Sequence, residues 1–382
     1  MTIGVVGLGR LGICAALVFA KAGFEVVGID INEERIKSIK NRERFFEPDV
    51  NNYLEKYNDR LKVSTDYKLL KDVSTVIVIP NTPSLPDGFF DVASVKNIVK
   101  RVDSINKKAL VVVSSNINIG TIDSLSVIHK RIVYNPEFVA QGSIIRGFEN
   151  PKFVVIGAYT EKDAEENANI WRKVHTKPIY FVEPTEAEII KLSLNVSYTL
   201  GITFANVIGE ACEKFSADSN KILDIIYQDR RNYKQGLGFM GPCFPRDTKC
   251  FAAFCLENAV GSGYRFASLL DELNQYTVER WIRKIKSMET KRIGILGIAY
   301  KPNVPYIDES QALKIAQSLL SDGYEVYIYD SLAMENAKRM LTGNVHFCST
   351  VEECVGKVDV VFIGTSNYSN TKIEKTVVNP WK

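Results

Sequence analysis

Short apolar runs alternate with longer amphipathic stretches near the N-terminus of the chain. Residues 2–30 contain an apolar run, a glycine turn, an apolar helical stretch and a second apolar run. Further apolar runs follow at Thr75–Pro80 and Ala109–Ser114, with helical stretches between them. Such alternation is typical of a sheet on which helices pack. The N-terminal part of the chain is therefore predicted to be an α/β domain.

The C-terminal part repeats the pattern of strand, turn and helix. Its predicted elements are a strand and turn at Lys291–Tyr300, a helix at Ser310–Leu320, a strand at Glu325–Tyr329 that ends at Asp330, and a strand at Val358–Gly364. This order predicts a second nucleotide-binding type of fold with a degraded glycine signature. The tail, 366–382, is polar and weakly patterned, and we expect it to be partly mobile.

The middle of the chain has a helical pattern. Residues 193–213 predict one long helix, which follows the acid-flanked segment 185–191, and another helical stretch follows Cys243. We therefore predict an α/β fold class with three parts. They are an N-terminal α/β domain over residues 1–184, a central helical domain over 185–285 and a C-terminal α/β domain over 286–382.

Composition narrows the classes of partner. At 382 residues and 46% hydrophobic content, the chain can bury two or three cores. The formal charge of +3 does not indicate a nucleic-acid-binding surface, although it does not exclude binding of small anionic ligands. Seven cysteines without paired metal-ligand spacing, and only three histidines, predict a reduced protein without a zinc site. Since no leader and no apolar run of roughly 18 residues is present, we expect a soluble, cytoplasmic protein.

Residues 2–30 also carry a dinucleotide-binding fingerprint in its full context. Gly7 permits a tight turn, Gly9 lets the backbone approach a pyrophosphate, and Gly12 allows helix and strand to pack closely. Asp30, at the end of the second strand, would accept hydrogen bonds from the ribose hydroxyls and repel a 2′-phosphate. The fingerprint therefore predicts NAD rather than NADP. A flavodoxin-like sheet with an accidental glycine pattern is the alternative.

Polar loops follow three of the predicted strands. Pro80–Pro83 and Ser115–Thr121 come directly after two of them, and Glu137 follows a proline at the end of the third. Ligands of open α/β sheets bind at the carboxyl ends of strands. The first two loops are therefore either part of a ligand site or ordinary surface loops.

The segment Gly238–Lys249 places a cysteine and an aspartate four residues apart, just past a glycine-rich turn. Pro245 is a good first helical residue, so Cys243 is predicted just ahead of a helix and Asp247 in its first turn. Exposed amides and the helix dipole at such a position favour a thiolate, which predicts a cysteine nucleophile beside a carboxylate. The alternative is that Cys243 is a small buried hydrophobic residue and Asp247 merely complements the helix dipole.

Lys191 and Asn195 are separated by one helical turn on one face of the predicted middle helix. Tyr198 and Thr199 belong to the same face. This polar face is either solvated or lines a polar cavity, and the sequence leaves both interpretations open.

Taken in order, these motifs resemble those of the UDP-sugar and GDP-sugar 6-dehydrogenases, and the resemblance covers the chain from end to end. The matched motifs are the glycine turn with Asp30, Asn135-Pro136-Glu137-Phe138, Lys191 with Asn195, the Gly238-Phe239 turn leading to Cys243 and Asp247, and Ala299-Tyr300-Lys301-Pro302-Asn303. Five ordered motifs are far more specific than any one of them.

The resemblance implies a four-electron oxidation of a nucleotide-sugar C6 alcohol, with NAD as cofactor and no metal. In this family the cysteine attacks an aldehyde to give a thiohemiacetal, a second hydride transfer gives a thioester, and hydrolysis releases the uronate. The implied domains are an NAD-binding Rossmann domain, a central dimerisation region and a C-terminal domain that binds the nucleotide sugar. The implied catalytic residues are Cys243, Asp247, Lys191, Asn195, Glu137 and Asn116. The implied cofactor-binding residues are Gly7, Gly9, Leu11, Gly12, Asp30, Arg35, Thr82 and Asn116, and the implied substrate-binding residues are Glu137, Phe138, Val139, Lys191, Asn195, Tyr233, Gly238, Phe239 and Lys301.

The chain departs from the family pattern at several positions. Asn116 replaces a threonine implicated in the first oxidation, and an amide can orient a water but lacks the hydroxyl. The other departures are Met240 for a glycine, Arg246 for a lysine, Ala140-Gln141-Gly142 for Arg-Glu-Gly, and Asp308 for an arginine. Asp308 puts a negative charge where a contact to the sugar nucleotide is expected.

The expected substrate is UDP-glucose, because Pro136-Glu137-Phe138 resembles that branch of the family and the GDP-mannose branch. GDP-mannose and UDP-N-acetylhexosamines are alternatives. Two other classes remain open. A two-electron dehydrogenase of the hydroxyacid or 6-phosphogluconate type would not need Cys243, and a catalytically silent nucleotide-sugar-binding homologue would explain Asn116 and Asp308.

The middle helix also predicts a homodimer. Its apolar residues surround most of the helix, and they are Leu194, Ile202, Phe204, Val207 and Ile208. A helix of this kind is normally buried on more than one side. The family resemblance suggests a second copy of the helix across a two-fold axis. Arg230 or Arg231 could then reach the neighbouring subunit's site, or could simply be solvated.

Overall fold

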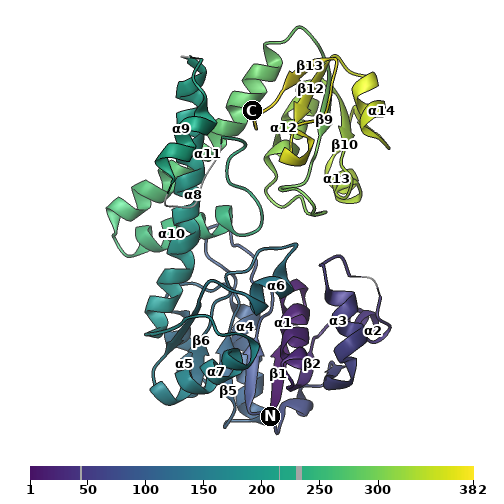
Figure 1. The fold of residues 1–382 in the computed structure, drawn as a ribbon. Helices are drawn as coiled ribbons and strands as arrows, with labels where there is room; N and C mark the ends of the chain where they lie inside the picture. The colour runs from purple at the N-terminus through teal and green to yellow at the C-terminus, as the bar shows by residue number, and fades with distance from the viewer. Residues whose placement is uncertain (44, 215, 229–234) are drawn as a thin grey trace. The chain divides into compact units, whose positions relative to one another are not determined.

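Two sheets organise the chain, one in each half. The protein is represented by a computed structural model, which describes residues 1–43, 45–214, 216–228 and 235–382. These residues form two units, Met1–Ser193 and Leu194–Lys382, and the boundary falls within the long helix α8 (Pro184–Lys214) (Figure 1). The predicted α/β fold class, with a helical middle between two sheets, is confirmed. The predicted boundaries at residues 184 and 285 stay a prediction.

The sheet of the first unit has eight strands in the order β3-β2-β1-β4-β5-β6-β7-β8. Neighbouring strands are parallel, except that β6 and β7 pair antiparallel. The strands are β1 (Thr2–Val6), β2 (Glu25–Ile29), β3 (Leu61–Ser64), β4 (Thr75–Val78), β5 (Leu110–Val113), β6 (Ile132–Tyr134), β7 (Val154–Ala158) and β8 (Ile179–Val182). The central strands β4 and β5 are buried along their whole length and apolar except for Thr75, as expected of parallel strands covered on both faces.

Helices pack on both faces of this sheet. They are α1 (Arg10–Lys21), α2 (Glu33–Lys40), α3 (Val50–Tyr57), α4 (Ala93–Ile105), α5 (Thr121–Ser126), α6 (Ile144–Glu149) and α7 (Glu161–Val174). One apolar cluster joins α1, α3, α6 and α7 to the sheet, and another joins α4, α5 and the first turn of α8. On α4 the buried residues are Val95, Ile98, Val99 and Val102, which is the spacing of one helical face.

The middle of the chain is helical, as predicted. Its elements are α8, which starts earlier than predicted, followed by α9 (Ser219–Ile226), α10 (Phe244–Glu257) and α11 (Gly261–Lys286). The early start of α8 reflects Pro184, whose fixed φ suits a first helical turn. Among the described residues, no helix combines the length and the apolar character needed to cross a membrane.

The second sheet has five parallel strands in the order β11-β10-β9-β12-β13. Its elements are β9 (Arg292–Leu296), α12 (Gln311–Ser321), β10 (Glu325–Tyr329), α13 (Met334–Met340), β11 (Val345–Phe347), α14 (Val351–Gly356), β12 (Val360–Ile363) and β13 (Thr376–Val378). The tail therefore adds the edge strand β13, and the indole of Trp381 donates to the Ile363 carbonyl at 3.1 Å. The sequence analysis did not predict this strand, because three residues suffice for an edge strand and give little pattern, and the expected mobility of the tail stays a prediction.

The two sheets share the same first turn. Gly7 and Gly297 both have positive φ, and each donates its amide to the last residue of the following strand, Ile29 and Tyr329 respectively. The aspartates that follow the second strand of each fold, Asp30 and Asp330, differ. Asp330 is buried and accepts four backbone hydrogen bonds, from Ile298, Ala299, Leu332 and Ala333. The second turn thus keeps the geometry of the first while its acid is used within the fold.

Candidate active site

The glycine turn after β1 has the close approaches that its sequence predicts. Gly7 has φ +96°, and a Cβ on it would lie 2.8 Å from the Pro80 nitrogen. A Cβ on Gly12 would lie 1.8 Å from the Gly7 carbonyl oxygen. In contrast, a Cβ on Gly9 would meet nothing within 4 Å. The space over Gly9, at the N-terminus of α1, is therefore open for a pyrophosphate, and these residues fit a dinucleotide.

The predicted ribose-binding acid lies beside this turn. The Asp30 carboxylate accepts from the amides of Leu8 at 2.7 Å and Asn32 at 2.9 Å. Arg35 comes from α2, and its Nε donates to the Leu8 carbonyl at 2.7 Å. Leu11 is half-buried against the core under α1. Asp30 and Arg35 thus both bind the backbone of Leu8, and these hydrogen bonds hold the turn in shape.

The loops after β4 and β5 contact each other. The Thr82 hydroxyl donates to the Asn116 carbonyl at 2.8 Å, and the Ser115 hydroxyl donates to the Pro80 carbonyl at 2.6 Å. The Asn116 Oδ1 atom is buried, and it has no hydrogen-bond partner among the described residues. The two polar loops therefore form one edge that includes an unsatisfied amide oxygen, which favours the ligand-site interpretation over an ordinary surface loop.

Lys191 is buried in the first unit and is not solvated. Its ammonium donates to the Glu137 carbonyl at 2.6 Å, lies 3.6 Å from the Glu137 carboxylate and 5.2 Å from the centre of the Phe138 ring. Only 4% of Lys191 is exposed. The Glu137 carboxylate also accepts from the Val139 amide at 2.9 Å. Lys191 and the segment from Glu137 to Val139 thus form one cluster, a contact that the sequence motifs did not predict.

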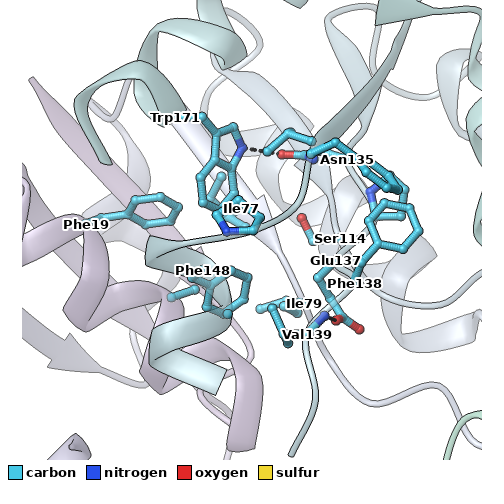
Figure 2. Close-up of a pocket in the computed structure, with 16 residues that line it drawn as sticks. Phe19, Ile77, Ile79, Ser114, Asn135, Glu137, Phe138, Val139, Phe148 and Trp171 are labelled. Atoms are coloured by element: carbon cyan, nitrogen blue, oxygen red, sulfur yellow. Dashed lines mark hydrogen bonds between the residues drawn. The ribbon is translucent and has the colours of Figure 1, made fainter. Parts of the chain in front are cut away.

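Asn135, two residues before Glu137, has a buried hydrogen-bond network that the sequence did not indicate. Its Oδ1 accepts from the indole of Trp171 at 2.5 Å and from Asn167 at 3.2 Å, and its Nδ2 donates to the Val155 carbonyl at 2.9 Å. Figure 2 shows the Asn135 and Trp171 pair beside a mainly apolar cavity, to which Phe19 of α1 and Phe148 of α6 also contribute. Asn135 therefore ties the end of β6 to β7 and α7. The available signals were its position directly after a strand and its place in the Asn135-Pro136-Glu137-Phe138 motif.

Glu188 is a second buried residue that the sequence did not single out. Its carboxylate accepts from the amides of Gly120 at 2.7 Å and Ile122 at 2.9 Å. It therefore caps α5 and anchors the loop that contains Asn116. Burial raises the pKa of Glu188 to about 7, with a smaller contribution from Asp123, while the backbone hydrogen bonds oppose the shift.

This pKa predicts how stability depends on pH. Because the pKa is raised in the folded state, the contribution of Glu188 to the unfolding free energy is fully present below about pH 4.5 and is lost as pH rises through 7. Relative to a Glu188→Gln variant, the wild-type protein should lose about 3 kcal/mol between pH 4.5 and pH 8, at about 1.4 kcal/mol per unit of pKa. Urea unfolding of both proteins across this range measures the difference. Parallel pH profiles would contradict the assignment.

The predicted nucleophile lies at the start of α10. Cys243 is the N-cap residue, and the Asp247 amide donates to its carbonyl at 2.8 Å. Asp247 is buried, and its carboxylate accepts from Asn195 of α8 at 2.5 Å. Cys243 is half-buried, whereas the other six cysteines are buried. The alternative of a buried structural cysteine therefore does not describe Cys243, and Asp247 does more than face the helix dipole.

Gly238 and Phe239 contribute mainly through their backbones. The Gly238 amide donates to the Gln311 side chain, and the Phe239 carbonyl accepts from Asn274. The Phe239 ring is buried in an apolar cluster with Val196 and Leu270. A direct substrate contact by the Phe239 side chain, as the resemblance implied, does not fit this position.

Some of the departures from the family pattern have local explanations. Met240 has no positive φ and packs against the core of the second sheet, so its position does not require glycine. The amide of Gly142 donates to Glu47 at 3.0 Å, which holds the altered segment 140–142. The Asp308 side chain is exposed. Lys301, a predicted substrate-binding residue, has its ammonium 5.7 Å from the centre of the neighbouring Tyr300 ring. The structure gives no account of the change at Arg246.

Several predicted positions cannot be placed. Tyr233, Arg230 and Arg231 lie outside the described residues. Within the described ranges, no group of three or more histidine, cysteine, aspartate or glutamate side chains could hold a metal ion.

Comparisons with known proteins agree along the whole chain. Three models of the UDP-glucose/GDP-mannose dehydrogenase family match it: the NAD binding domain at residues 1–175, the central domain at 185–276 and the UDP binding domain at 294–379. The chain is 30% identical to UDP-glucose 6-dehydrogenase TuaD of Bacillus subtilis, over 95% of this chain and 83% of the relative. It is 28% identical to a GDP-mannose 6-dehydrogenase of Pseudomonas aeruginosa, over 86% and 81%. The structure of a UDP-glucose dehydrogenase from Pyrobaculum islandicum superposes with a TM-score of 0.92 at 27% identity, over 100% of this chain and 94% of that one.

Proposed function

Because the chain belongs to the UDP-glucose/GDP-mannose dehydrogenase family, we propose that it oxidises the C6 alcohol of UDP-glucose to the carboxylate with Cys243 as nucleophile. The family consists of NAD-dependent nucleotide-sugar 6-dehydrogenases, and residues 1–175 are its NAD-binding domain. The observation that supports the proposal most is the arrangement at α10. A half-buried cysteine caps the helix there, one turn before a buried aspartate that is hydrogen-bonded to Asn195.

NAD would be held at the turn after β1. Gly7, Gly9 and Gly12 shape the space for its pyrophosphate, and Asp30 would face the ribose. Leu11, Arg35, Thr82 and Asn116 complete the proposed set of cofactor-binding residues. When bound, NAD accepts a hydride from C6 in each of two successive oxidations, which together remove four electrons from the alcohol.

Cys243 keeps the substrate bound between these oxidations. Its sulfur adds to the aldehyde carbon, the carbonyl oxygen takes up a proton, and a thiohemiacetal forms. Loss of that proton and a hydride leaves a thioester. Water then adds to the thioester carbon, the carbon–sulfur bond breaks, and the thiolate departs as the acid is released. The covalent bond prevents escape of the aldehyde.

The remaining polar residues would stabilise the developing oxyanion and handle the water that hydrolyses the thioester. Lys191 and Asn195 are proposed to donate to the developing oxyanion, an effect of roughly 3 to 4 kcal/mol per donor. Asp247 and Glu137 are proposed to act on the hydrolytic water. Asn116, whose Oδ1 is buried and unsatisfied, is proposed to orient a water in place of the usual threonine.

The nucleotide sugar would bind through the C-terminal domain and the loops described above. The proposed contacts are made by Glu137, Phe138, Val139, Lys191, Asn195, Tyr233, Gly238, Phe239 and Lys301, with Phe239 contributing its backbone. Under this proposal residues 1–184 bind NAD, 185–285 carry the cysteine and the dimer contact, and 286–382 bind the nucleotide. The proposed compartment is the cytoplasm.

A substrate screen tests the proposal. UDP-glucose, GDP-mannose and UDP-N-acetylhexosamines are offered in turn with NAD, and NADH is followed at 340 nm, the wavelength at which it absorbs. UDP-glucose should give the highest kcat/KM. A higher value for another sugar would reassign the substrate, and binding of NAD and sugar without NADH would support a silent homologue.

Cofactor preference follows from Asp30. In an Asp30→Ala, Ile31→Arg variant, the ratio of kcat/KM for NADP to that for NAD should rise at least about tenfold, since a repulsion is replaced by an attraction to the 2′-phosphate. Ile31 is 78% exposed, so the arginine needs no internal space. Ile31→Arg alone is the control. An unchanged ratio in the double variant would mean that Asp30 does not contact the ribose hydroxyls.

We also propose that the protein is a homodimer. Leu200 and Phe204 on α8, with Ile225 and Ile226 on α9, are 40% to 60% exposed. Exposed apolar residues on neighbouring helices are typical of an interface between subunits. Light scattering at assay concentration should give about twice the 42.9 kDa mass of one chain. An active species at 42.9 kDa would contradict the dimer.

A further inference from the structure

The segment 235–242, here called the cysteine loop, leads directly to Cys243 and has neither helix nor strand along its length. Buried backbone groups in such a segment need hydrogen-bond partners from elsewhere. In the cysteine loop these partners are mostly amide side chains. Asn206, Asn274 and Gln311 come from α8, α11 and α12, and all three are buried.

Two of these amides close a ring of hydrogen bonds with the loop. The Gly238 amide donates to Gln311 Oε1 at 2.7 Å, and Gln311 Nε2 donates to Asn274 Oδ1 at 2.9 Å. Asn274 Nδ2 then donates to the Phe239 carbonyl at 2.9 Å. Turning either amide over would place donor against donor or acceptor against acceptor. The ring therefore has one orientation, and its members strengthen one another in a buried setting.

The fit between the ring and the loop leaves no space. A Cβ on Gly238 would lie 2.0 Å from Asn274 Oδ1 and 2.4 Å from Gln311 Nε2. A Cβ on Gly241, where φ is +88°, would lie 2.6 Å from the Tyr300 ring. These glycines are thus required because side chains pack directly on the backbone. The loop has little freedom to shift while the ring is intact.

Further contacts hold the loop on either side of the ring. The Gly236 amide donates to Asn206 at 3.0 Å, and the Trp381 ring would lie 2.5 Å from a Cβ on Gly236. The Gly241 amide donates to the Asp308 carbonyl at 3.0 Å. The loop is therefore supported from its first residues to within two residues of Cys243.

Gln311 connects this support to the C-terminal domain. It is the first residue of α12 and follows the segment 297–310, which contains Lys301 and the Asp308 carbonyl. Under the proposed function this segment belongs to the nucleotide-binding domain. A displacement of residues 308–311 would therefore move the two oxygens, Gln311 Oε1 and the Asp308 carbonyl, that accept from the amides of Gly238 and Gly241.

We propose that Gln311 and Asn274 are positioning residues that fix Cys243 for reaction by holding the Gly238-Phe239 backbone. The catalytic part of this inference rests on the proposed function, while the structural part concerns the reactivity of the Cys243 thiol alone. Neither side chain touches the reacting atoms. Their effect passes through the loop.

The test uses the full chain and four variants. Gln311→Met has similar length without the hydrogen bonds, Gln311→Glu keeps an acceptor for the Gly238 amide, and Asn274→Leu removes the other amide. Gln317→Met is the matched control, because Gln317 lies exposed on the same helix. Two quantities are measured: the rate of Cys243 alkylation by iodoacetamide, followed by mass spectrometry, and steady-state kinetics with NAD and nucleotide sugar.

We expect Gln311→Met to change the alkylation rate several-fold and to lower kcat at least about tenfold, since small displacements of a reacting group cost that much. KM for NAD should stay within about twofold. Gln311→Glu should recover part of kcat, and the Gln311→Met, Asn274→Leu pair should be less than additive because both belong to one ring.

The proposal is overturned if both Gln311 variants match Gln317→Met in alkylation rate and kcat. If Gln311→Met fails to fold by circular dichroism, the same criteria apply to Gln311→Glu. If the wild-type protein oxidises no nucleotide sugar, the proposed function fails, and the alkylation rates still decide whether Gln311 positions the thiol.

Discussion

A Cys243→Ser variant is expected to bind NAD and the nucleotide sugar. Its rate of uronate formation should fall by a factor on the order of a thousand or more. A serine hydroxyl has no comparable anionic form near neutral pH, so the covalent route to the acid closes. The first oxidation does not need the sulfur, and a small amount of NADH can still form. The measurement is uronate and NADH per enzyme, with binding followed separately by calorimetry.

Cys255→Ser is the matched control, because Cys255 lies on the same helix and is buried. It should retain uronate production, provided that the variant stays folded. Full turnover to uronate by Cys243→Ser would rule out the covalent mechanism and favour a dehydrogenase that does not use the cysteine.

Gly9→Val is expected to weaken NAD binding by about ten- to a hundredfold, while the protein stays folded. A side chain on Gly9 meets no protein atom within 4 Å, so it enters the space where the pyrophosphate approaches the backbone. Each charge-assisted hydrogen bond lost there corresponds to about 1.5 to 3 kcal/mol. Calorimetric titration with NAD measures the loss.

Gly356→Val serves as the control for adding a side chain at an open glycine. Gly356 ends α14 in the other unit, and a Cβ on it also meets nothing within 4 Å. Both variants should melt within a few degrees of the wild-type protein. Unchanged NAD affinity in Gly9→Val would contradict the placement of the pyrophosphate over this turn.

The sequence was most informative where local rules decide the structure. The turn of Gly7, Gly9 and Gly12 was predicted because each glycine answers a local constraint, and the structure shows close approaches at Gly7 and Gly12 and open space at Gly9. The start of α10 was predicted within one residue because Pro245 favours a first turn. The buried strands β4 and β5 were recognisable because parallel strands covered on both faces are mainly apolar.

Positions that depend on distant contacts were not predictable. Lys191 could equally have been solvated, and its contacts with Glu137 and Phe138, which are distant in sequence, accompany its burial. Asn135 and Glu188 carry no local signature of a buried network, because their partners come from other helices and strands. Gln311 looks like an ordinary first residue of a helix, yet it binds a loop 73 residues away. Polar residues with long-range partners need the fold before their role is visible.

Phe239 shows why a motif alone does not say which part of a residue meets a ligand. Its place in a matched motif suggests a substrate contact, but its ring is 1% exposed and packs between helices, so only its backbone is proposed for that contact. The motif preserves the backbone path around Gly238 as well as the residues that react. A residue inside a functional motif therefore needs its burial before it is assigned to the substrate.

The number of NADH molecules formed for each nucleotide sugar consumed shows whether Cys243 carries the substrate through both oxidations. With sugar limiting and NAD in excess, we expect two NADH and one uronate per sugar, because the cysteine retains the aldehyde until the second oxidation. A ratio of one, with aldehyde or ketone as the final product, would contradict this role of Cys243.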